Sequence, residues 1–523
     1  MYCSGSGTHF IKDGKKMKRF IPFLLSVVIC FVFFGCTRAE KEVSVEETTE
    51  ETVTEPVFEK KITLGYYEDK SLNPYTTDSP ANRSISTLIY DPLYILDSSY
   101  SPVGIIAESC EISGVTVTVK IKSGLTFSNG ATLSSYDVAY SFNQAKESSF
   151  YSARLENISY ATPLSDSVVF TLVQPDVYCE AVLTFPIVQS YTAESDTPVG
   201  SGRYTLSKTS EGTVLRANNN NSRGEDIATN TIYLTPISSK ASELYLLQSG
   251  DLSYFFDDLS DSEYIKIGAN IKQVPMNNLV FIGINSFSPA MSDSFVRQAV
   301  TTAINPKTVA DAVFSGMCRY APTPFNPDWY NCERLELQPP SVSLTRAQEL
   351  LTQGGYVYAY DNNTYRSKDF EYLVVRLAVN KENSDKLQCA QYIHDTLEAI
   401  GIDVELNALP YSDYTEAIKS GEYDLYIGEV RLPANMSLSC FFNENGALSY
   451  GIDTESTVAA SYKDFMAGTT DVSTFIQVFD TYKPFIPLCY RDGVAYFSRE
   501  FTFEGEITEY EPFLNASTWR TVE

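Results

Sequence analysis

Hydrophobic residues along the chain follow two periods, one typical of strands and one typical of helices. Residues 115–121 read Val-Thr-Val-Thr-Val-Lys-Ile, an alternation that predicts a half-buried strand. In residues 294–303, Val296, Val300 and Ala303 are spaced by three or four positions. They share one face of a predicted helix. The pattern therefore predicts a mixture of strands and helices.

Both patterns recur through the first three hundred residues. Ser134 precedes Asp137 by three positions, which predicts a helix that starts with a capping box. The apolar residues of 82–90 also share one helical face. Further expected elements are strands over residues 62–66, 167–172, 202–206, 231–234, 251–254 and 278–285, and a helix over residues 240–247 that ends at Gly250.

Beyond residue 344 the predicted elements alternate regularly. Gly401 and Gly421 have the position of helix C-caps. The alternation is typical of βαβ units in a parallel sheet, and no repeat suggests a solenoid or a propeller. The expected order is helix 344–353, strand 373–379, helix 384–400, strand 402–406, helix 412–419 and strand 423–428.

The N-terminal region has the composition of an export signal. Basic residues 15–19 precede an apolar run from Phe20 to Phe34, which is short for a membrane span. Residues 1–35 are therefore predicted to be a signal peptide, with Met17 as an alternative start. Gly35-Cys36 resembles the lipobox of bacterial lipoproteins, which implies a lipidated Cys36; a chance cysteine after an ordinary signal is the alternative. Acidic residues 36–59 then predict a flexible tether.

The charge of the chain excludes one class of partner. The net charge is −27, and the chain beyond residue 35 has 34 basic and 65 acidic residues, a net −31. Such a surface repels phosphate backbones, so nucleic-acid binding is not expected. The acidity is typical of an exported protein that stays soluble, and we expect a monomer.

The sequence carries no pattern for catalysis or for a metal. Its only histidines are His9 and His394, and His394 lies in the predicted helix 384–400 as a surface or half-buried residue. A multi-histidine metal site cannot be built from them. No G-x-S-x-G, H-E-x-x-H or Walker A motif occurs. We therefore expect no enzyme activity, no metal and no cofactor.

Seven cysteines follow Cys36, and no C-x-x-C pair occurs among them. This spacing argues against zinc and thioredoxin-like sites. Cys318 and Cys332 are the nearest pair in sequence and are candidates for a disulfide in an exported protein. The alternative for all seven is a small buried side chain.

A series of motifs resembles one family of receptors. The residues Val199-Gly-Ser-Gly-Arg-Tyr204 are one example. The other motifs are at residues 71–75, 88–94, 106–109, 121–130, 133–142, 246–251, 295–306, 397–404 and 421–425. In this order they resemble the bacterial extracellular solute-binding proteins of family 5, the receptors for oligopeptides, dipeptides and nickel.

The resemblance implies an α/β clamshell of the periplasmic-binding-protein type (type II, cluster C), with two lobes and an extra family-specific domain. The ligand is enclosed between the lobes, and hinges near residues 273–278 and 487–492 allow closure. The implied domains are domain I (residues 60–92, 200–276 and 489–523), domain II (93–199) and domain III (277–488).

The resemblance also implies where the ligand binds, although one family feature is missing. Peptide-binding members carry a Trp and, three residues later, an Asp that binds the peptide ammonium group; here Val430 and Pro433 stand in those positions. Glu429 and Arg431 flank the spot on one side of a predicted strand. They could together bind a zwitterion. The alternative is that they pair with each other or face solvent.

Further expected contacts come from both lobes. The facing lobe is expected to contribute Thr77, Asp78 and Ser79, for which an ordinary surface loop is the alternative. Asn435 and Tyr490, the latter beside a hinge, complete the expected site.

These features predict a lipid-anchored binding protein of an ABC importer. It would hold short peptides on the outer face of the cytoplasmic membrane, at the cell surface or in the periplasm, and deliver them to permease subunits and their ATPases. A non-peptide solute (a nickel chelate, an opine or an oligosaccharide) and a peptide-sensing signalling receptor are the alternatives.

Overall fold

The computed structural model describes residues 60–210, 212–259, 264–332, 335, 341–360 and 364–522. All of them belong to one compact unit of the chain, residues 59–523. The predicted signal peptide, Cys36 and the tether lie outside the described residues. In the part that is described, no helix is long and apolar enough to cross a membrane.

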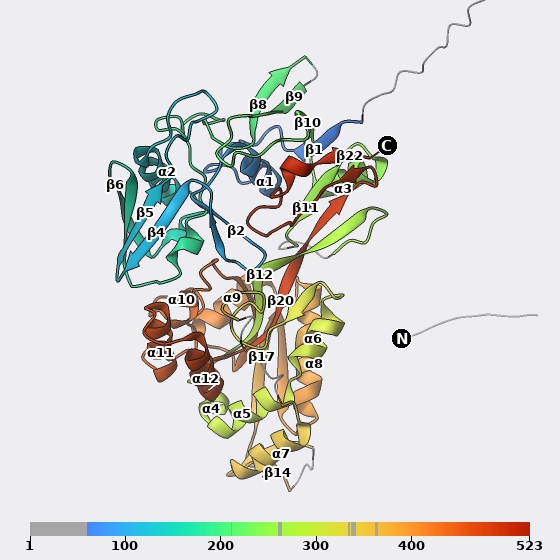
Figure 1. Cartoon of the computed structure of the whole chain (residues 1–523). Helices are drawn as coiled ribbons and strands as arrows, with labels where there is room; N and C mark the ends of the chain where they lie inside the picture. The colour runs from blue at the N-terminus through green and yellow to red at the C-terminus, as the bar shows by residue number, and fades with distance from the viewer. Residues whose placement is uncertain are drawn as a thin grey trace, which may run out of the picture. The chain divides into compact units, whose positions relative to one another are not determined.

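Two long antiparallel strands, β12 (Asn270–Ile284) and β20 (Phe485–Phe497), form the centre of an eleven-stranded sheet. They run through both halves of the described unit (Figure 1). Beyond β20 the order continues with β11 (Tyr254–Asp257), β1 (Ile62–Tyr66), β10 (Thr231–Pro236), β9 (Gly212–Ala217) and β8 (Tyr204–Thr209), and β13 (Cys318–Tyr320) also pairs with β20.

The strands beyond β12 come from the predicted βαβ units. β17 (Val374–Asn380) is parallel to both β18 (Asp403–Leu409) and β19 (Leu425–Arg431), as the alternation predicts. The connecting helices are α8 (Ser384–Glu398) and α9 (Tyr411–Ser420). Gly421 ends α9 with a φ of 75°, a left-handed conformation that glycine adopts without strain.

A separate sheet of four antiparallel strands lies beside helix α2 (Ser135–Glu147). The predicted capping box is present, because the Asp137 carboxylate accepts hydrogen bonds from the backbone N–H of Ser134 at 2.9 Å and from its hydroxyl at 2.7 Å. The sheet has the order β4 (Ala107–Ser113), β5 (Thr116–Ile121), β7 (Ser167–Leu172) and β6 (Ile158–Pro163).

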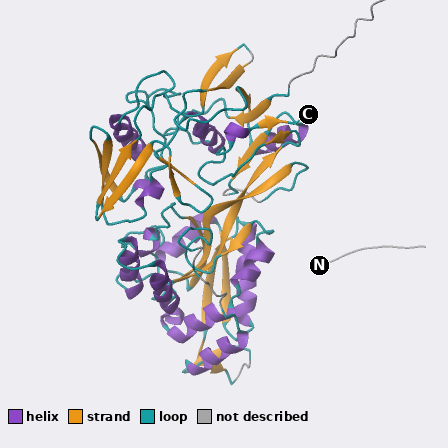
Figure 2. Ribbon diagram, viewed as in Figure 1, coloured by secondary structure: helices purple, strands orange, loops and turns teal. Residues whose placement is uncertain are grey.

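The remaining elements are mostly helices. Many of them lie around the strands of the βαβ units, whereas α1 (Pro80–Ile89) and α3 (Lys240–Ser249) lie in the other half of the described unit (Figure 1 and Figure 2). Predicted helices 294–303 and 344–353 match α5 and α7 residue for residue. The other helices are α4 (Pro289–Ser292), α5 (Ser294–Ala303), α6 (Pro306–Val313), α7 (Leu344–Gln353), α10 (Ser439–Phe442), α11 (Thr457–Met466), α12 (Val472–Tyr482), η1 (Ala153–Leu155), η2 (Cys179–Val182) and η3 (Ala516–Thr518). The short strands are β2 (Tyr94–Leu96), β3 (Pro102–Gly104), β14 (Val357–Tyr358), β15 (Arg366–Lys368), β16 (Glu371–Tyr372), β21 (Phe501–Thr502) and β22 (Arg520–Thr521).

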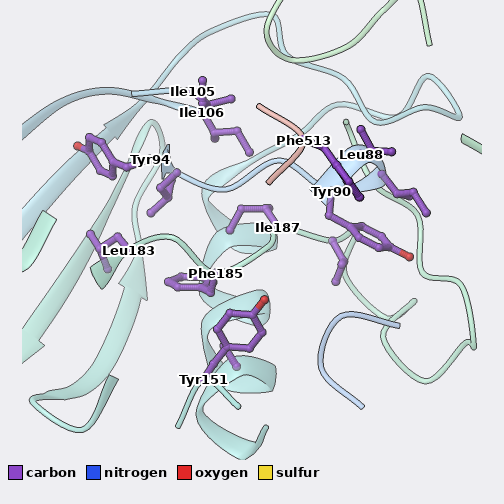
Figure 3. Close-up of a cluster of buried hydrophobic side chains, with 14 of the residues drawn as sticks. Leu88, Tyr90, Tyr94, Ile105, Ile106, Tyr151, Leu183, Phe185, Ile187 and Phe513 are labelled. Carbon is purple, nitrogen blue, oxygen red and sulfur yellow. The ribbon is translucent and has the colours of Figure 1, made fainter. Parts of the chain in front are cut away.

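Distinct hydrophobic clusters define two lobes. The first cluster joins residues of α1, the four-stranded sheet and the C-terminal segment around Phe513 and Trp519. Figure 3 shows part of it, with Leu88, Tyr90 and Phe513 close together. A second cluster, around β17 and α8, is built from residues of the segment 280–489. A third, around Trp329 and Phe441, is built mostly from residues of the segment 279–490, and Leu96, Tyr100 and Ala181 also belong to it. We call the part of the structure built on the first cluster the upper lobe. The part built on the other two clusters is the lower lobe.

The expected disulfide between Cys318 and Cys332 is wrong. Both cysteines are free thiols, as are the other five described cysteines, at positions 110, 179, 389, 440 and 489. Cys318 lies on β13 against the cluster around α8, and its Sγ is 3.2 Å from the Ala310 carbonyl oxygen. Cys332 is buried in the cluster around Trp329. The two cysteines therefore pack against different hydrophobic clusters, although they are near each other in the sequence.

Candidate functional site

Three adjoining hollows lie where the two lobes meet. Their volumes are about 380, 560 and 740 Å³, within the range of 300–1,000 Å³ that is typical of small-molecule sites. Arg154 lines all three, and Arg431 and Tyr510 line the first and the third. Shared residues make the hollows parts of one cleft.

The first hollow lies mainly in the upper lobe, between the face of α1 and the C-terminal segment. Its walls include Tyr67, Arg83, Thr87, Phe150, Tyr151, Arg154, Arg223, Lys240, Glu243, Asp257, Asp258, Arg431, Glu509, Tyr510 and Glu511. The second and third hollows lie between residues 153–176 of the upper lobe and residues 430–467 of the lower lobe.

Three of the predicted contacts line this cleft. Arg431 lines the first and third hollows, Val430 the third, and Asn435 the second. The Asn435 side chain donates a hydrogen bond of 2.7 Å to the carboxylate of Asp176, which joins the lower lobe to the upper one. Burial raises the pKa of Asp176 to about 6.

Glu429 and Arg431 do not pair with each other, and each has its own partners. Glu429 binds the Lys386 ammonium group at 2.8 Å and the Arg491 guanidinium at 3.2 Å, and it does not line a hollow. Arg431 binds Glu509 and Asp258. Burial opposes the charge of Arg431, but these two carboxylates raise its pKa overall. Both residues are therefore already neutralised by protein groups.

The segment expected from the facing lobe has local roles. The Ser79 hydroxyl caps α1 by accepting the Asn82 N–H at 3.2 Å, and Thr77 is buried and accepts the Ser79 N–H at 3.3 Å. Asp78 forms an exposed ion pair of 2.8 Å with Lys70. None of the three expected residues lines a hollow; the next residues, on α1 itself, line the first hollow.

Tyr490 also lies away from the cleft. It is fully buried in the lower lobe, and its hydroxyl donates a hydrogen bond of 2.7 Å to the Pro324 carbonyl oxygen. It lines none of the three hollows. The structure thus places Tyr490 in the core beside the expected hinge.

The expected hinges coincide with an interruption of strand pairing. The register of β12 and β20 shifts between the pairs Val274–Gly493 and Asn278–Arg491. In the interrupted part, the Asn277 N–H donates a hydrogen bond of 2.7 Å to the carboxylate of Glu509. Residues 275–277 of β12 therefore have no partner residue on β20, and the ladder is interrupted at this point.

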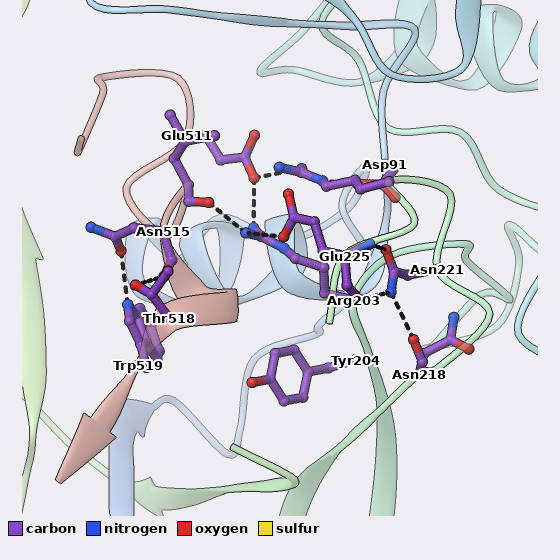
Figure 4. Close-up of polar contacts among 12 residues, drawn as sticks. Asp91, Arg203, Tyr204, Asn218, Asn221, Glu225, Glu511, Asn515, Thr518 and Trp519 are labelled. Atoms are coloured by element: carbon purple, nitrogen blue, oxygen red, sulfur yellow. Dashed lines mark hydrogen bonds and ion pairs between the residues drawn. The ribbon is translucent and has the colours of Figure 1, made fainter. Parts of the chain in front are cut away.

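Most charges of the first hollow belong to closed networks. Figure 4 shows the Glu511 carboxylate, which accepts hydrogen bonds from Arg203 at 2.7 Å and from Arg223 at 2.5 Å. Arg223 also binds Asp91 at 2.8 Å. These side chains are nearly inaccessible to solvent.

Two cations of this hollow differ from the others. Among the described residues, neither Arg83 nor Arg154 has an ion pair. The Arg83 guanidinium lies 3.7 Å from the centre of the Phe150 ring, and Arg154 lies 4.2 Å from it. Burial lowers the pKa of both guanidinium groups. Neither arginine was predicted as a site residue, because an arginine on a short helix normally extends into solvent.

The architecture defines the class of protein. The two lobes share long strands and meet around a cleft lined by polar and aromatic side chains. This arrangement is typical of a clamshell receptor for small ligands. Among the described residues, no group of three or more His, Cys, Asp or Glu side chains is arranged to hold a metal ion.

Comparison with known proteins assigns the family. Residues 101–435 match the model of the bacterial extracellular solute-binding proteins, family 5, so the chain belongs to this family. The oligopeptide-binding protein AppA of Bacillus subtilis is 22% identical over 439 residues, which cover 78% of this chain and 80% of AppA. The chain is therefore a solute-binding protein of the ABC-importer type and not an enzyme.

Solved structures support the clamshell fold. The unliganded open form of the periplasmic murein tripeptide binding protein MppA has a TM-score of 0.72 at 14% identity, covering 89% of this chain and 98% of MppA. NikA of Brucella suis, in complex with Fe(III)-EDTA, has a TM-score of 0.66 at 18% identity, covering 88% of this chain and 99% of NikA. At these identities the likeness establishes the fold alone.

Proposed function

We propose that this protein captures short peptides in the cleft between its lobes and delivers them to an ABC permease with its ATPases. The observation that carries the proposal is the first hollow, where aromatic side chains surround two guanidinium groups that have no ion pair among the described residues. Aromatic rings provide rigid contact area for varied side chains, and unpaired cations attract the charged end of a peptide. The names of AppA and MppA, which specify an oligopeptide and a murein tripeptide, support the same ligand class.

A second candidate ligand is a metal chelate that carries carboxylates. Unpaired guanidinium groups suit such a chelate as well as a peptide, and NikA is described with Fe(III)-EDTA. An opine, an oligosaccharide and a role in peptide sensing are further alternatives without a specific observation in their favour.

The proposal includes a location and a mode of action. A signal peptide over residues 1–35, a lipidated Cys36 and an acidic tether would hold a monomeric receptor at the outer face of the cytoplasmic membrane. The three domains of the family division would close by bending near residues 273–278 and 487–492. The interrupted pairing of β12 and β20 supports hinges at these positions.

The proposal is tested by native mass spectrometry of a chain that begins at residue 59 and is expressed in peptide-rich cells. Denaturation then releases whatever has co-purified. A series of short peptides would support the peptide receptor. A single metal-containing mass would replace the peptide with a chelate and leave the receptor role intact, whereas an empty protein would favour a sensing role or a rarer ligand.

A further inference from the structure

Arg83 and Arg154 approach one phenyl ring from different parts of the upper lobe. Arg83 extends from α1 and Arg154 from the short helix η1. Their guanidinium groups lie 3.7 and 4.2 Å from the centre of the Phe150 ring. Arg154 also lies 5.3 Å from the Tyr510 ring. Cation–π contacts of this kind hold a guanidinium in place without neutralising its charge.

The Arg83 guanidinium has a buried donor without a hydrogen-bond partner. Arg83 donates one hydrogen bond of 3.2 Å, from Nη2 to the Thr77 carbonyl oxygen. Its Nε is buried and has no hydrogen-bond partner. Buried donors are normally paired, because an unpaired one loses its hydrogen bonds to water. An acceptor that the chain itself does not supply would satisfy this atom.

The charged neighbours of the two arginines are mostly paired with one another. Arg431 and Arg223 each have two carboxylate partners, and Lys240 binds Asp257. Burial, followed by the nearby Asp257, raises the pKa of Glu243 to about 8, so this carboxyl is mostly neutral at pH 7. Five cationic side chains and four ionised carboxylates therefore line the first hollow, and Arg83 and Arg154 are the two of these cations that have no ion pair among the described residues.

We propose that Arg83 and Arg154 together bind a carboxylate group of the ligand, with Phe150 fixing both guanidinium groups. A guanidinium presents a planar pair of N–H donors that matches a carboxylate, and two of them can bind both oxygens. A bare metal cation would be repelled by the same pair. The inference rests on the proposed function, because it assigns one end of the ligand within the same cleft.

The carboxylate can belong to the C-terminus of a peptide or to a chelate, and binding experiments distinguish these sources. Three pools are offered to the chain that begins at residue 59: tripeptides with a free C-terminus, the same tripeptides as C-terminal amides, and nickel(II)–histidine. Bound species are counted by native mass spectrometry. We expect free-acid tripeptides to bind at least about tenfold more tightly than their amides.

The variants Arg83→Gln and Arg154→Gln test the residues themselves. Each should weaken binding of the free acid about tenfold or more and leave binding of the amide unchanged, which a purely structural role would not do. Arg346→Gln is the matched control, because Arg346 is exposed on α7 and pairs with Glu349 at 2.9 Å. Thermal melting should show that all three variants are folded as well as the parent.

The outcomes separate this inference from the proposed function. Equal binding of acids and amides would overturn the carboxylate site and leave the peptide receptor standing. Binding of nickel(II)–histidine alone, lost in both glutamine variants, would retain the carboxylate site and overturn the peptide ligand. Binding that is insensitive to both variants, or no binding from any pool, would overturn the carboxylate site.

Discussion

The buried network around Glu511 gives the strongest prediction about stability. The Glu511 carboxylate accepts hydrogen bonds from Arg203 and Arg223, whose side chains are 0% and 2% exposed. Glu511→Gln keeps the shape of the side chain and removes the charge that both guanidinium groups share. Breaking a buried ion pair leaves an uncompensated charge and costs about 3–5 kcal/mol. Glu225, whose carboxylate is 3.8 Å from Arg203, offsets part of this cost. We therefore expect a loss of about 3 kcal/mol.

The loss can be measured in the upper lobe by itself. The chain has two tryptophans, and Trp519 is buried in the upper lobe whereas Trp329 is buried in the lower one. In a Trp329→Phe background, urea unfolding followed by tryptophan fluorescence reports the upper lobe. Glu108→Gln is the control in the same lobe, since its pair with Lys120 is exposed and should contribute less than about 0.5 kcal/mol. A loss below about 1 kcal/mol for Glu511→Gln would refute the reasoning.

Two other substitutions follow from burial and packing. The raised pKa of Glu243, about 8 against an ordinary 4.5, means that the folded state holds this proton more tightly than the unfolded state. The contribution of Glu243 to the free energy of unfolding should therefore be fully present below pH 4.5. It should decline as the pH rises to 8, by at most about 5 kcal/mol. Urea unfolding at several pH values should show that Glu243→Gln reduces this decline; an unchanged slope would contradict the assignment. Gly283→Ala would place a Cβ 1.9 Å from the Tyr426 ring and should cost about 1–3 kcal/mol, whereas Gly268→Ala, with open space around it, should change little. Similar thermal melting of both alanine variants would count against the packing at Gly283.

Local signals in the sequence predicted many elements of the fold correctly. The capping box of Ser134 and Asp137 and the terminal glycines 250 and 421 depend only on neighbouring residues, and the structure confirms them. The parallel pairing of β17, β18 and β19 likewise follows from strands and helices that alternate along the chain.

The long central strands were harder to predict. The expected strand 278–285 covers only the second part of β12, and β20 was not predicted as a strand. Both strands carry buried polar residues near the break in pairing, among them Asn277, Arg491 and Asp492. Their partners come from distant segments; Asp492, for example, binds Arg319 at 2.7 Å. Such pairs interrupt the hydrophobic alternation that identifies a strand.

The candidate site depends on contacts between distant segments. Family resemblance placed Val430, Arg431 and Asn435 near the cleft, and these residues do line it. It could not show that Arg431 is neutralised by Glu509, a residue 78 positions away. Nor could it show that Arg83 and Arg154 meet at one ring, because nothing in either local sequence differs from a solvated helix.

The central claim is that the ligand binds in the first hollow through Arg83 and Arg154, and a crystal structure with the co-purified ligand tests it most directly. The account predicts that the ligand lies between α1 and Tyr510, with a carboxylate within hydrogen-bond distance of both guanidinium groups. A ligand bound elsewhere, or one in this hollow whose carboxylate avoids both arginines, would contradict it.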